Sequence, residues 1–147
     1  MLSIIIPVYN EVKTIDKVLF KIKKLSQIKK QIIIVDDGST DGTTDQLKKL
    51  KKQYKIDNII LCKKNKGKGH AIKLGKKKIK YKFTIIQDAD LEYDPYDYNK
   101  LLLPFFETDA DVVYGSRFLG GGKYVRIHFF WHYLANKILT FICNVFT

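Results

Sequence analysis

The stretch QIIIVDDGSTDGT, residues 31–43, decides the fold class of this chain. Gln31–Asp36 is a short apolar run that ends in an acid, which is typical of a strand buried on both faces of a parallel sheet. The segment that follows, DGSTDG, contains turn-forming and helix-capping residues, and the pattern of Thr43–Lys52 predicts a helix. A buried strand joined to a helix by a short turn is a repeating unit of α/β proteins.

The same alternation continues on both sides of this stretch. Short apolar runs predict four further strands, at Leu2–Val8, where Pro7 interrupts the run, and at Asn58–Cys62, Phe83–Gln87 and Asp111–Tyr114. Helical spacing or helix-start signals predict helices over residues 12–25, over Lys68–Lys80 and from Asp94-Pro95 through Phe106. The sequence therefore predicts an α/β fold with a mainly parallel sheet and helices on both faces.

Size and composition place this pattern in one globular domain. The chain has 147 residues, of which 46% are hydrophobic, enough for one core but not for two domains, and global disorder is excluded. Cys62 and Cys143 lack the spacing of a zinc site or a disulfide framework, so a reducing, cytoplasmic setting is expected. No apolar stretch reaches the roughly 18 residues that a membrane-spanning helix needs.

The charge is strongly positive and comes almost wholly from lysine. The net charge is +12, and the 27 basic residues include only two arginines, Arg117 and Arg126. Such an excess is most simply explained by solubility or biased codon usage, and the functional alternative is attraction to an anionic membrane surface or a nucleic acid. The lysines follow the outer faces of several predicted helices and do not form one basic face with interleaved aromatics, so we expect no nucleic-acid partner.

Acidic residues follow the predicted strands at the edge of the sheet where ligands bind in this fold class. Asp88 and Asp90 leave a predicted buried strand two residues apart on extended backbone, so both carboxylates can reach one hard cation, Mg²⁺ or Mn²⁺. Glu92 is a candidate third ligand. The structural alternative is that Asp88-Ala89-Asp90 is an ordinary loop sequence.

Two other segments at this edge have both a structural and a functional interpretation. Asp36 and Asp37 begin a turn and helix cap, but an acid at a strand end can also accept hydrogen bonds from a nucleobase or ribose. Lys66-Gly67-Lys68-Gly69-His70 opens a predicted helix, either as a solvated cap or as an anion site made of free amides, the helix dipole and the lysines. The sequence contains neither a P-loop nor, after its first strand, a G-x-G-x-x-G turn.

Five segments, in this order, resemble the family 2 glycosyltransferases of the GT-A fold. They are SIIIPVYNE (3–11), VDDGSTDGT (35–43), NKGKGHAIKLG (65–75), QDADLEYDP (87–95) and VVYGSRF (112–118). The resemblance covers about residues 2 to 137 and looks like the subgroup that charges polyprenyl phosphates, which includes dolichol-phosphate mannose synthase and the undecaprenyl-phosphate glycosyltransferases. It implies a Rossmann-like nucleotide-sugar fold and an inverting transfer by single displacement.

The resemblance also implies a role for each matching residue. Asp88 and Asp90 would hold the metal and the donor diphosphate, with Glu92 at the same metal. Arg117 would pair with the acceptor phosphate, with Arg126 as a second clamp, so that Asp88, Asp90 and Arg117 are the predicted catalytic residues. Together with Lys66 of the anion site, the residues expected in the nucleotide-sugar pocket are Pro7, Tyr9, Glu11, Val35, Asp37 and Ala89, of which Asp37 contacts the base.

We expect two regions in the chain. Residues 1–127 are the predicted catalytic domain, and residues 128–147 are an amphipathic aromatic segment suited to a membrane interface or to packing on the sheet. Sequences of this kind continue past the region around Asn136, so the fold is expected to be incomplete at its C-terminal end and the natural protein to extend beyond Thr147.

The sequence therefore predicts a metal-dependent transferase at the cytoplasmic face of a membrane. It would move a sugar from a GDP- or UDP-linked donor to a dolichyl or undecaprenyl phosphate. One alternative is a family 2 enzyme that acts on a saccharide or another non-lipid acceptor in cell-envelope polysaccharide synthesis, and another is a truncated, non-catalytic nucleotide-binding relative. A nucleotidyltransferase is disfavoured because its glycine-rich turn after the first strand is missing.

Overall fold

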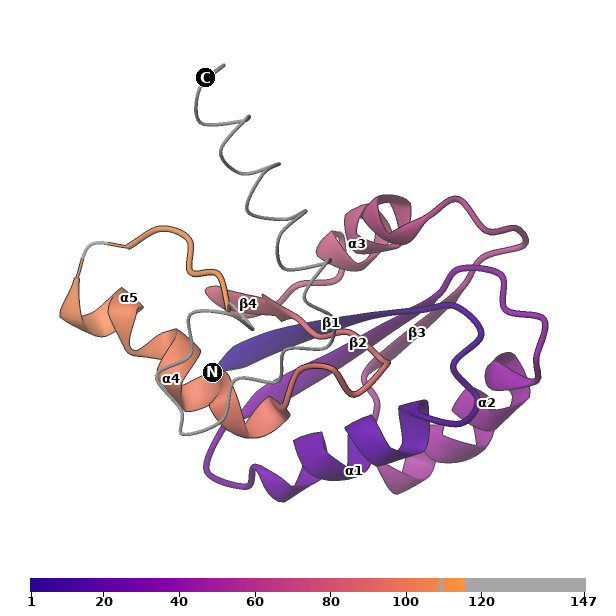
Figure 1. The fold of residues 1–147 in the computed structure, drawn as a ribbon, viewed down its shortest axis with the longest axis horizontal. Helices are drawn as coiled ribbons and strands as arrows, with labels where there is room; N and C mark the ends of the chain where they lie inside the picture. Colours follow the sequence, from indigo (N-terminus) through magenta and orange to yellow (C-terminus); the bar gives the residue numbers. More distant parts are fainter. Residues whose placement is uncertain (109, 116–147) are drawn as a thin grey trace, which may run out of the picture. The chain divides into compact units, whose positions relative to one another are not determined.

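Four parallel strands form one sheet in the order β3-β2-β1-β4 (Figure 1). They are β1 (Leu2–Val8), β2 (Lys30–Asp36), β3 (Asn58–Leu61) and β4 (Phe83–Ile86). The computed structural model describes residues 1–108 and 110–115, which fall into two units: Met1–Lys100, which contains the sheet, and the described part of Leu101–Thr147. The predicted α/β fold with a parallel sheet is confirmed.

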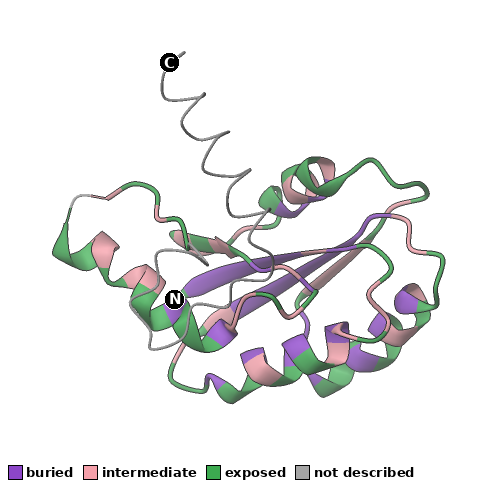
Figure 2. Cartoon of the chain, viewed as in Figure 1, coloured by how far each residue is buried: buried purple, intermediate pink, exposed green. Residues whose placement is uncertain are grey.

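The two central strands, β1 and β2, form the buried middle of the sheet (Figure 2). Every residue of β1 except Pro7 is buried, and β2 is buried from Gln31 onward, so the apolar surface of both strands is removed from water. Pro7 does not interrupt β1. The pairing of β1 with β4 ends at Ile5, so the missing N–H of Pro7 breaks no hydrogen bond on that side.

Helices cover both faces of the sheet in the first unit. The helices α1 (Ile15–Lys24) and α2 (Thr43–Gln53) lie on one face, and α3 (Lys68–Lys76) packs on β1 and β2 from the other (Figure 1). Helix α3 approaches the sheet closely at Gly75, where an added Cβ would lie 2.7 Å from Cγ2 of Ile5. The buried stripe of α1 has helical spacing and consists of Ile15, Val18, Leu19 and Ile22.

Asp94 caps the helical segment that begins at Pro95. Its Oδ1 accepts a hydrogen bond from the N–H of Tyr96 at 3.1 Å and Pro95 follows, which confirms the predicted cap. The segment is not one helix through Phe106: η1 (Pro95–Asp97) and α4 (Tyr98–Leu102) are followed by α5 (Pro104–Glu107). The break falls before Pro104, because proline has no N–H with which to continue the helical hydrogen bonds.

Two predicted elements differ in the structure. Asp111–Tyr114 is not a strand, since it pairs with no other described segment, and Val112 is 65% exposed and Tyr114 88%. Helix α3 ends at Lys76 and not at Lys80, because buried Gln31 binds the backbone beyond it. The Gln31 amide donates to the carbonyl of Lys78 at 2.8 Å, and its Oε1 accepts from the N–H of Lys80 at 3.0 Å.

No helix within the described residues is long and apolar enough to span a membrane. Residues 128–147, the predicted amphipathic segment, lie outside the part that the structure describes.

Candidate functional site

The carboxyl ends of the strands meet at one edge of the sheet. The chain adds β2 and β3 on one side of β1 and then returns to place β4 on the other side, so the strand order reverses between β1 and β4. Such a reversal of strand order is where open α/β sheets bind ligands. A cavity of about 320 Å³ opens at this point. It is lined by residues that follow β1, β2 and β4 and by the start of α3: Pro7, Val8, Tyr9, Glu11, Asp37, Asn65, Gly67, Lys68, Ala71, Asp88, Ala89 and Asp90.

The two adjacent acids at the end of β2 have different partners. Asp36 accepts a hydrogen bond from the N–H of Ser39 at 3.0 Å on Oδ1 and one from the Thr44 hydroxyl on Oδ2, so its carboxylate closes the turn that leads into α2. Asp37 lines the cavity instead. The turn-and-cap interpretation therefore accounts for Asp36 and leaves Asp37 as the candidate ligand-binding acid.

Asp37 is buried, and its two oxygens differ. The backbone N–H groups of Lys66 and Gly67 donate to Oδ2 at 2.9 and 2.7 Å, which fixes the carboxylate against the loop before α3. Oδ1 accepts no hydrogen bond from any described residue, and Nδ1 of His70, which is equally unpartnered there, lies 3.7 Å away. A buried polar atom without a partner costs about 1–3 kcal/mol, so Oδ1 is positioned to accept a donor from a ligand.

The loop after β4 is shaped by a buried glutamine. The side-chain amide of Gln87 donates to the carbonyls of Asp88 at 3.0 Å and Tyr93 at 3.1 Å, and its Oε1 accepts from the hydroxyl of Tyr98 at 2.8 Å. Burial raises the pKa of the Tyr98 hydroxyl, which therefore stays a donor at every ordinary pH. Gln87 thus holds both ends of the loop that presents Asp88 and Asp90 to the cavity.

One carboxylate of this loop already binds a positively charged group of the protein. Both oxygens of Asp88 contact the ammonium group of Lys68, at 2.7 and 2.8 Å, while Oδ1 of Asp90 accepts the N–H of Glu92 at 2.9 Å. The side chain of Asp88 is only 21% exposed. Two carboxylates on one cavity wall, one of them neutralised by a lysine from across the cavity, fit the oxygen ligands that Mg²⁺ and Mn²⁺ prefer.

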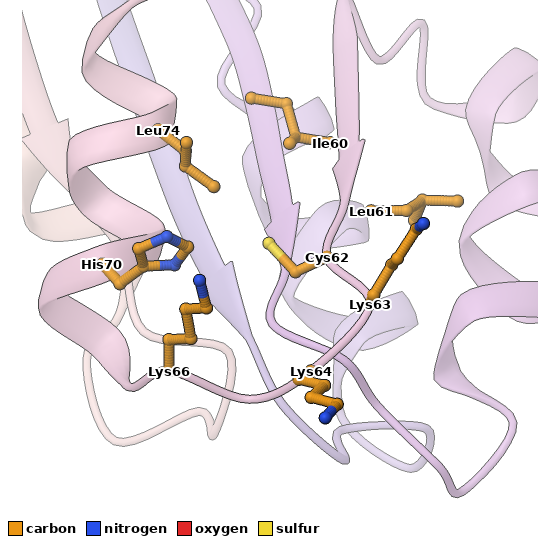
Figure 3. A pocket seen from close by; sticks show the side chains of 8 residues that line it. All are labelled: Ile60, Leu61, Cys62, Lys63, Lys64, Lys66, His70 and Leu74. Atoms are coloured by element: carbon orange, nitrogen blue, oxygen red, sulfur yellow. The ribbon is translucent and has the colours of Figure 1, made fainter.

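Two backbone N–H groups just before α3 already have a partner within the protein. Gly67 has φ +91°, a left-handed conformation that favours glycine, and its N–H and that of Lys66 point to Asp37 and not to an anion. The cation that α3 contributes to the cavity is the side chain of Lys68. The side chain of Lys66 lines a second cavity, of about 460 Å³, together with Cys62 and His70 (Figure 3).

Of the residues predicted from the sequence, the structure brings most together and leaves some apart. One cavity wall contains Pro7, Tyr9, Glu11, Asp37, Asp88, Ala89 and Asp90. Val35 is fully buried in β2, and neither it nor Lys66 nor Glu92 is among the residues that line this cavity. Arg117 and Arg126, the predicted acceptor clamps, lie outside the described residues.

Two residues have roles at the site that the sequence did not predict. Lys68, expected only as a lysine of the anion site, neutralises Asp88, and Gln87, expected only as the end of a strand, holds the loop of Asp88. A signal for Gln87 was available, since it is a polar residue at the end of an apolar run immediately before Asp88. The partner of Lys68 is set by the packing of α3 on the sheet, which sequence spacing does not reveal.

Comparison with known proteins gives the same picture of the chain. The model of the family described as Glycosyl transferase family 2 matches residues 3–146. An uncharacterized protein of Methanocaldococcus jannaschii is 41% identical over 148 residues, which cover 97% of this chain and 59% of the relative. The dolichol-phosphate mannosyltransferase of Pyrococcus furiosus is 32% identical over 122 residues, which cover 82% of this chain and 34% of the relative. The chain thus spans only part of the length of both relatives.

A solved structure supports the fold. A mannosyltransferase from Pyrobaculum calidifontis in complex with GDP-Man and Mn²⁺ superposes with a TM-score of 0.59 at 24% sequence identity. The superposition covers 65% of this chain and 29% of the other. It shows that the two proteins share the arrangement of strands and helices.

Proposed function

This chain belongs to glycosyl transferase family 2, and from that premise we propose that it moves a sugar from a nucleotide-diphosphate sugar to a polyprenyl phosphate. One observation carries the donor half of the proposal. A single cavity at the reversal of strand order contains an acid with an open buried oxygen, Asp37, and a lysine-paired carboxylate, Asp88, in a loop with a second acid, Asp90. These are the groups needed to bind a base at one end and a diphosphate at the other.

In this proposal the base binds at Asp37. Oδ1 of Asp37 is a buried acceptor, and both uracil and guanine carry ring N–H donors that can satisfy it. Tyr9, which is 45% exposed at the same cavity, offers an aromatic face beside the base. GDP- and UDP-linked sugars are therefore the donors that we expect.

The diphosphate would lie between Lys68 and the loop of Asp88. Asp88 and Asp90 would hold a divalent cation, Mg²⁺ or Mn²⁺, with Glu92 as a further candidate ligand. When bound, such a cation stabilises the negative charge that develops on the departing diphosphate. Lys68 supplies a second positive charge from across the cavity, and Gln87 keeps the loop in place while charge moves from the sugar bond to the diphosphate.

The acceptor half of the proposal rests on the chemistry of phosphate and on one relative. The Pyrococcus relative is named a dolichol-phosphate mannosyltransferase. A phosphate acceptor is already an anionic nucleophile at neutral pH, so an inverting displacement on it needs no general base. We propose that Arg117 and Arg126 bind that phosphate through their planar forks, and that the protein works at the cytoplasmic surface of a membrane.

The test is a donor and acceptor panel. The protein is incubated with UDP-, GDP- and dTDP-sugars, with and without polyprenyl phosphate, and release of nucleotide diphosphate is measured. Release that depends on polyprenyl phosphate supports the proposal. Release that occurs only with a saccharide acceptor would instead support the alternative, a family 2 enzyme that acts on a saccharide. Nucleotide binding without any turnover would favour the alternative of a non-catalytic nucleotide-binding module for these 147 residues.

A further inference from the structure

A second cavity, next to the proposed donor site, contains chemistry that a sugar transfer does not use. It lies between the end of β3 and α3, has a volume of about 460 Å³, and has apolar walls formed by Ile60 and Leu74 (Figure 3). Cys62 points into it from the end of β3, and His70 points toward Cys62 from α3 (Figure 3). Asp37 closes the cluster from the end of β2.

These three side chains bring a sulfur, a nitrogen and an oxygen together. One ligand atom from each of Asp37, Cys62 and His70 lies within 4.8 Å of the others, and Oδ1 of Asp37 is 3.7 Å from Nδ1 of His70. Those two atoms are buried and accept or donate no hydrogen bond among the described residues, and the side chain of Asp37 is only 4% exposed. One cation bound to both atoms would satisfy these two buried groups.

Each of the three residues is held by regular structure. Oδ2 of Asp37 is fixed by two backbone amides, and the N–H of Cys62 donates to the carbonyl of Asp36 at 2.8 Å, which continues the pairing of β2 with β3. His70 lies in the first turn of α3, where its N–H donates to the carbonyl of Gly67 at 3.0 Å. The cluster is therefore positioned by the backbone before any ligand arrives.

We propose that Asp37, Cys62 and His70 form a binding site for a borderline-soft divalent cation of the Zn²⁺ type, separate from the oxygen-ligand site of Asp88 and Asp90. Zinc binds thiolate sulfur at about 2.3 Å and histidine nitrogen or carboxylate oxygen at about 2.0–2.2 Å, which places a tetrahedral nitrogen–oxygen pair roughly 3.3–3.6 Å apart and a sulfur about 3.5–3.7 Å from either. The 3.7 Å between Oδ1 of Asp37 and Nδ1 of His70 is slightly longer than that spacing, and all three ligand atoms lie within 4.8 Å of one another, so the side chains would close around the ion as it binds.

The donor set and the charges are consistent with such a cation. One thiolate, one imidazole and one carboxylate favour zinc over Mg²⁺, and three protein ligands leave a fourth position open. The two negative ligands neutralise the charge of the ion. Three lysines, Lys63, Lys64 and Lys66, line the same cavity, and because all three are exposed their ammonium groups can turn to solvent when the cation binds.

Occupation of this site has a consequence that rests on the proposed function. The oxygen of Asp37 that would bind the cation is the one that would accept a hydrogen bond from the donor base. A bound Zn²⁺ ion and a nucleotide sugar therefore compete for one atom, and the site would make donor binding sensitive to this cation.

The test uses Co²⁺ in place of Zn²⁺ and contains no nucleotide, so its result does not depend on the proposed function. The full chain, with its cysteines reduced, is titrated with Co²⁺ and the near-ultraviolet absorption of thiolate-to-cobalt charge transfer is followed. Cobalt held by carboxylates alone gives no such band. We expect the band in the parent and in Cys143→Ser, the matched control, and its loss in Cys62→Ser.

A second measurement separates binding from folding. Calorimetry with Zn²⁺ should show an affinity lower by on the order of 100-fold in His70→Ala and unchanged in His128→Ala, with circular dichroism confirming that each variant is folded. A reduced, folded parent that shows no band overturns the site. So does a band that persists in Cys62→Ser, or a Zn²⁺ affinity that His70→Ala leaves unaltered.

Discussion

The ammonium nitrogen of Lys68 lies 2.7 Å from one carboxylate oxygen of Asp88 and 2.8 Å from the other. The first residue of α3 thus places a positive charge on the first acid of the loop after β4. A cation that binds Asp88 must compete with that charge, whereas an incoming diphosphate can take the lysine over. This geometry makes the occupancy of Asp88 depend on whether a nucleotide is present.

Replacement of Lys68 by methionine should therefore have opposite effects on two ligands. Without nucleotide, the affinity for Mn²⁺ should rise by about 1.4- to fivefold, the amount that a partly exposed ion pair of roughly 0.2–1 kcal/mol represents. The affinity for nucleotide diphosphate should fall, because a charge that contacts phosphate is lost. Calorimetry measures both, and Lys76→Met, at the other end of α3, is the control. Equal changes of affinity in the two variants would contradict a role of Lys68 in binding either ligand.

Sugar transfer should depend on a divalent cation. EDTA should abolish release of nucleotide diphosphate, and Mg²⁺ or Mn²⁺ should restore it. Asp90→Ala should lower the rate by on the order of 10² or more, comparable to the loss of a main electrostatic stabiliser. Asp45→Ala, which removes an exposed acid of α2, should leave the rate unchanged. Full activity in EDTA would contradict the metal role of Asp88 and Asp90.

Asp37→Asn tests the open oxygen with little disturbance of the fold. The asparagine oxygen can still accept the N–H groups of Lys66 and Gly67, but an NH₂ donor replaces the open acceptor. Affinity for free nucleotide diphosphate should fall by an amount that corresponds to about 1–3 kcal/mol. Calorimetry with Asp45→Asn as the control gives the comparison, and unchanged affinity would mean that Asp37 serves only to fix the loop before α3.

Two glycines of α3 should respond oppositely to alanine. At Gly75 the new Cβ would lie 2.7 Å from Cγ2 of Ile5, and overpacking of this kind lowers the free energy of unfolding by about 1–3 kcal/mol. At Gly69 the new Cβ would meet no heavy atom within 4 Å, so the higher helix propensity of alanine should raise stability by up to about 1 kcal/mol. Urea denaturation of the two variants measures both changes.

The ion pair of Lys21 with Asp94, at 2.7 Å, should make stability depend on pH. Burial alone would raise the pKa of Asp94, but the hydrogen bond from Lys21, the N–H of Tyr96 and the charge of Lys21 together lower it. A carboxyl with a lowered folded pKa stabilises the protein above its unfolded pKa of about 3.9, and this contribution is lost as the pH falls through the folded value.

Asp94→Asn should accordingly unfold more easily than the parent at pH 7, and the difference should shrink as the pH falls below about 4. Because the Asp94 side chain is 41% exposed, the ion pair should contribute less than about 1 kcal/mol. Denaturation curves at several pH values give the comparison. A difference that stays constant down to pH 2 would assign the effect to the helix cap and not to the charge.

The sheet could be predicted from the sequence because its central strands are continuous apolar runs. The same rule failed at Asp111–Tyr114, where an apolar run has no partner strand among the described residues, and a run of four residues does not reveal whether a partner exists. The end of α3 could not be predicted either. It is set by Gln31, a residue of another element, whose side chain binds the backbone of Lys78 and Lys80.

The candidate site was partly predictable for a similar reason. Asp37, Asp88 and Asp90 follow strands directly, so parallel topology alone brings them to one edge. Which of two adjacent acids faces the cavity depends on hydrogen bonds across the turn, so the residue pattern alone does not separate Asp36 from Asp37, and the choice of Asp37 rests on the family resemblance. The N–H of Lys66 donates to Asp37, whereas its side chain lines the other cavity. The side chain points there because of the loop conformation before α3, which the sequence does not reveal.

The buried side chain of Gln87 ties together the two ends of the loop after β4, and Asp90 and Glu92 are the exposed residues between those ends. Ordering a backbone residue costs roughly 1–2 kcal/mol, and here that entropy is lost when the protein folds and not when a ligand arrives. These exposed residues can then be replaced while the loop keeps its conformation. In the proposed function, preference for one cation or sugar over another could then change at Asp90 or Glu92 without a new loop, as long as Gln87 and the hydroxyl of Tyr98 remain.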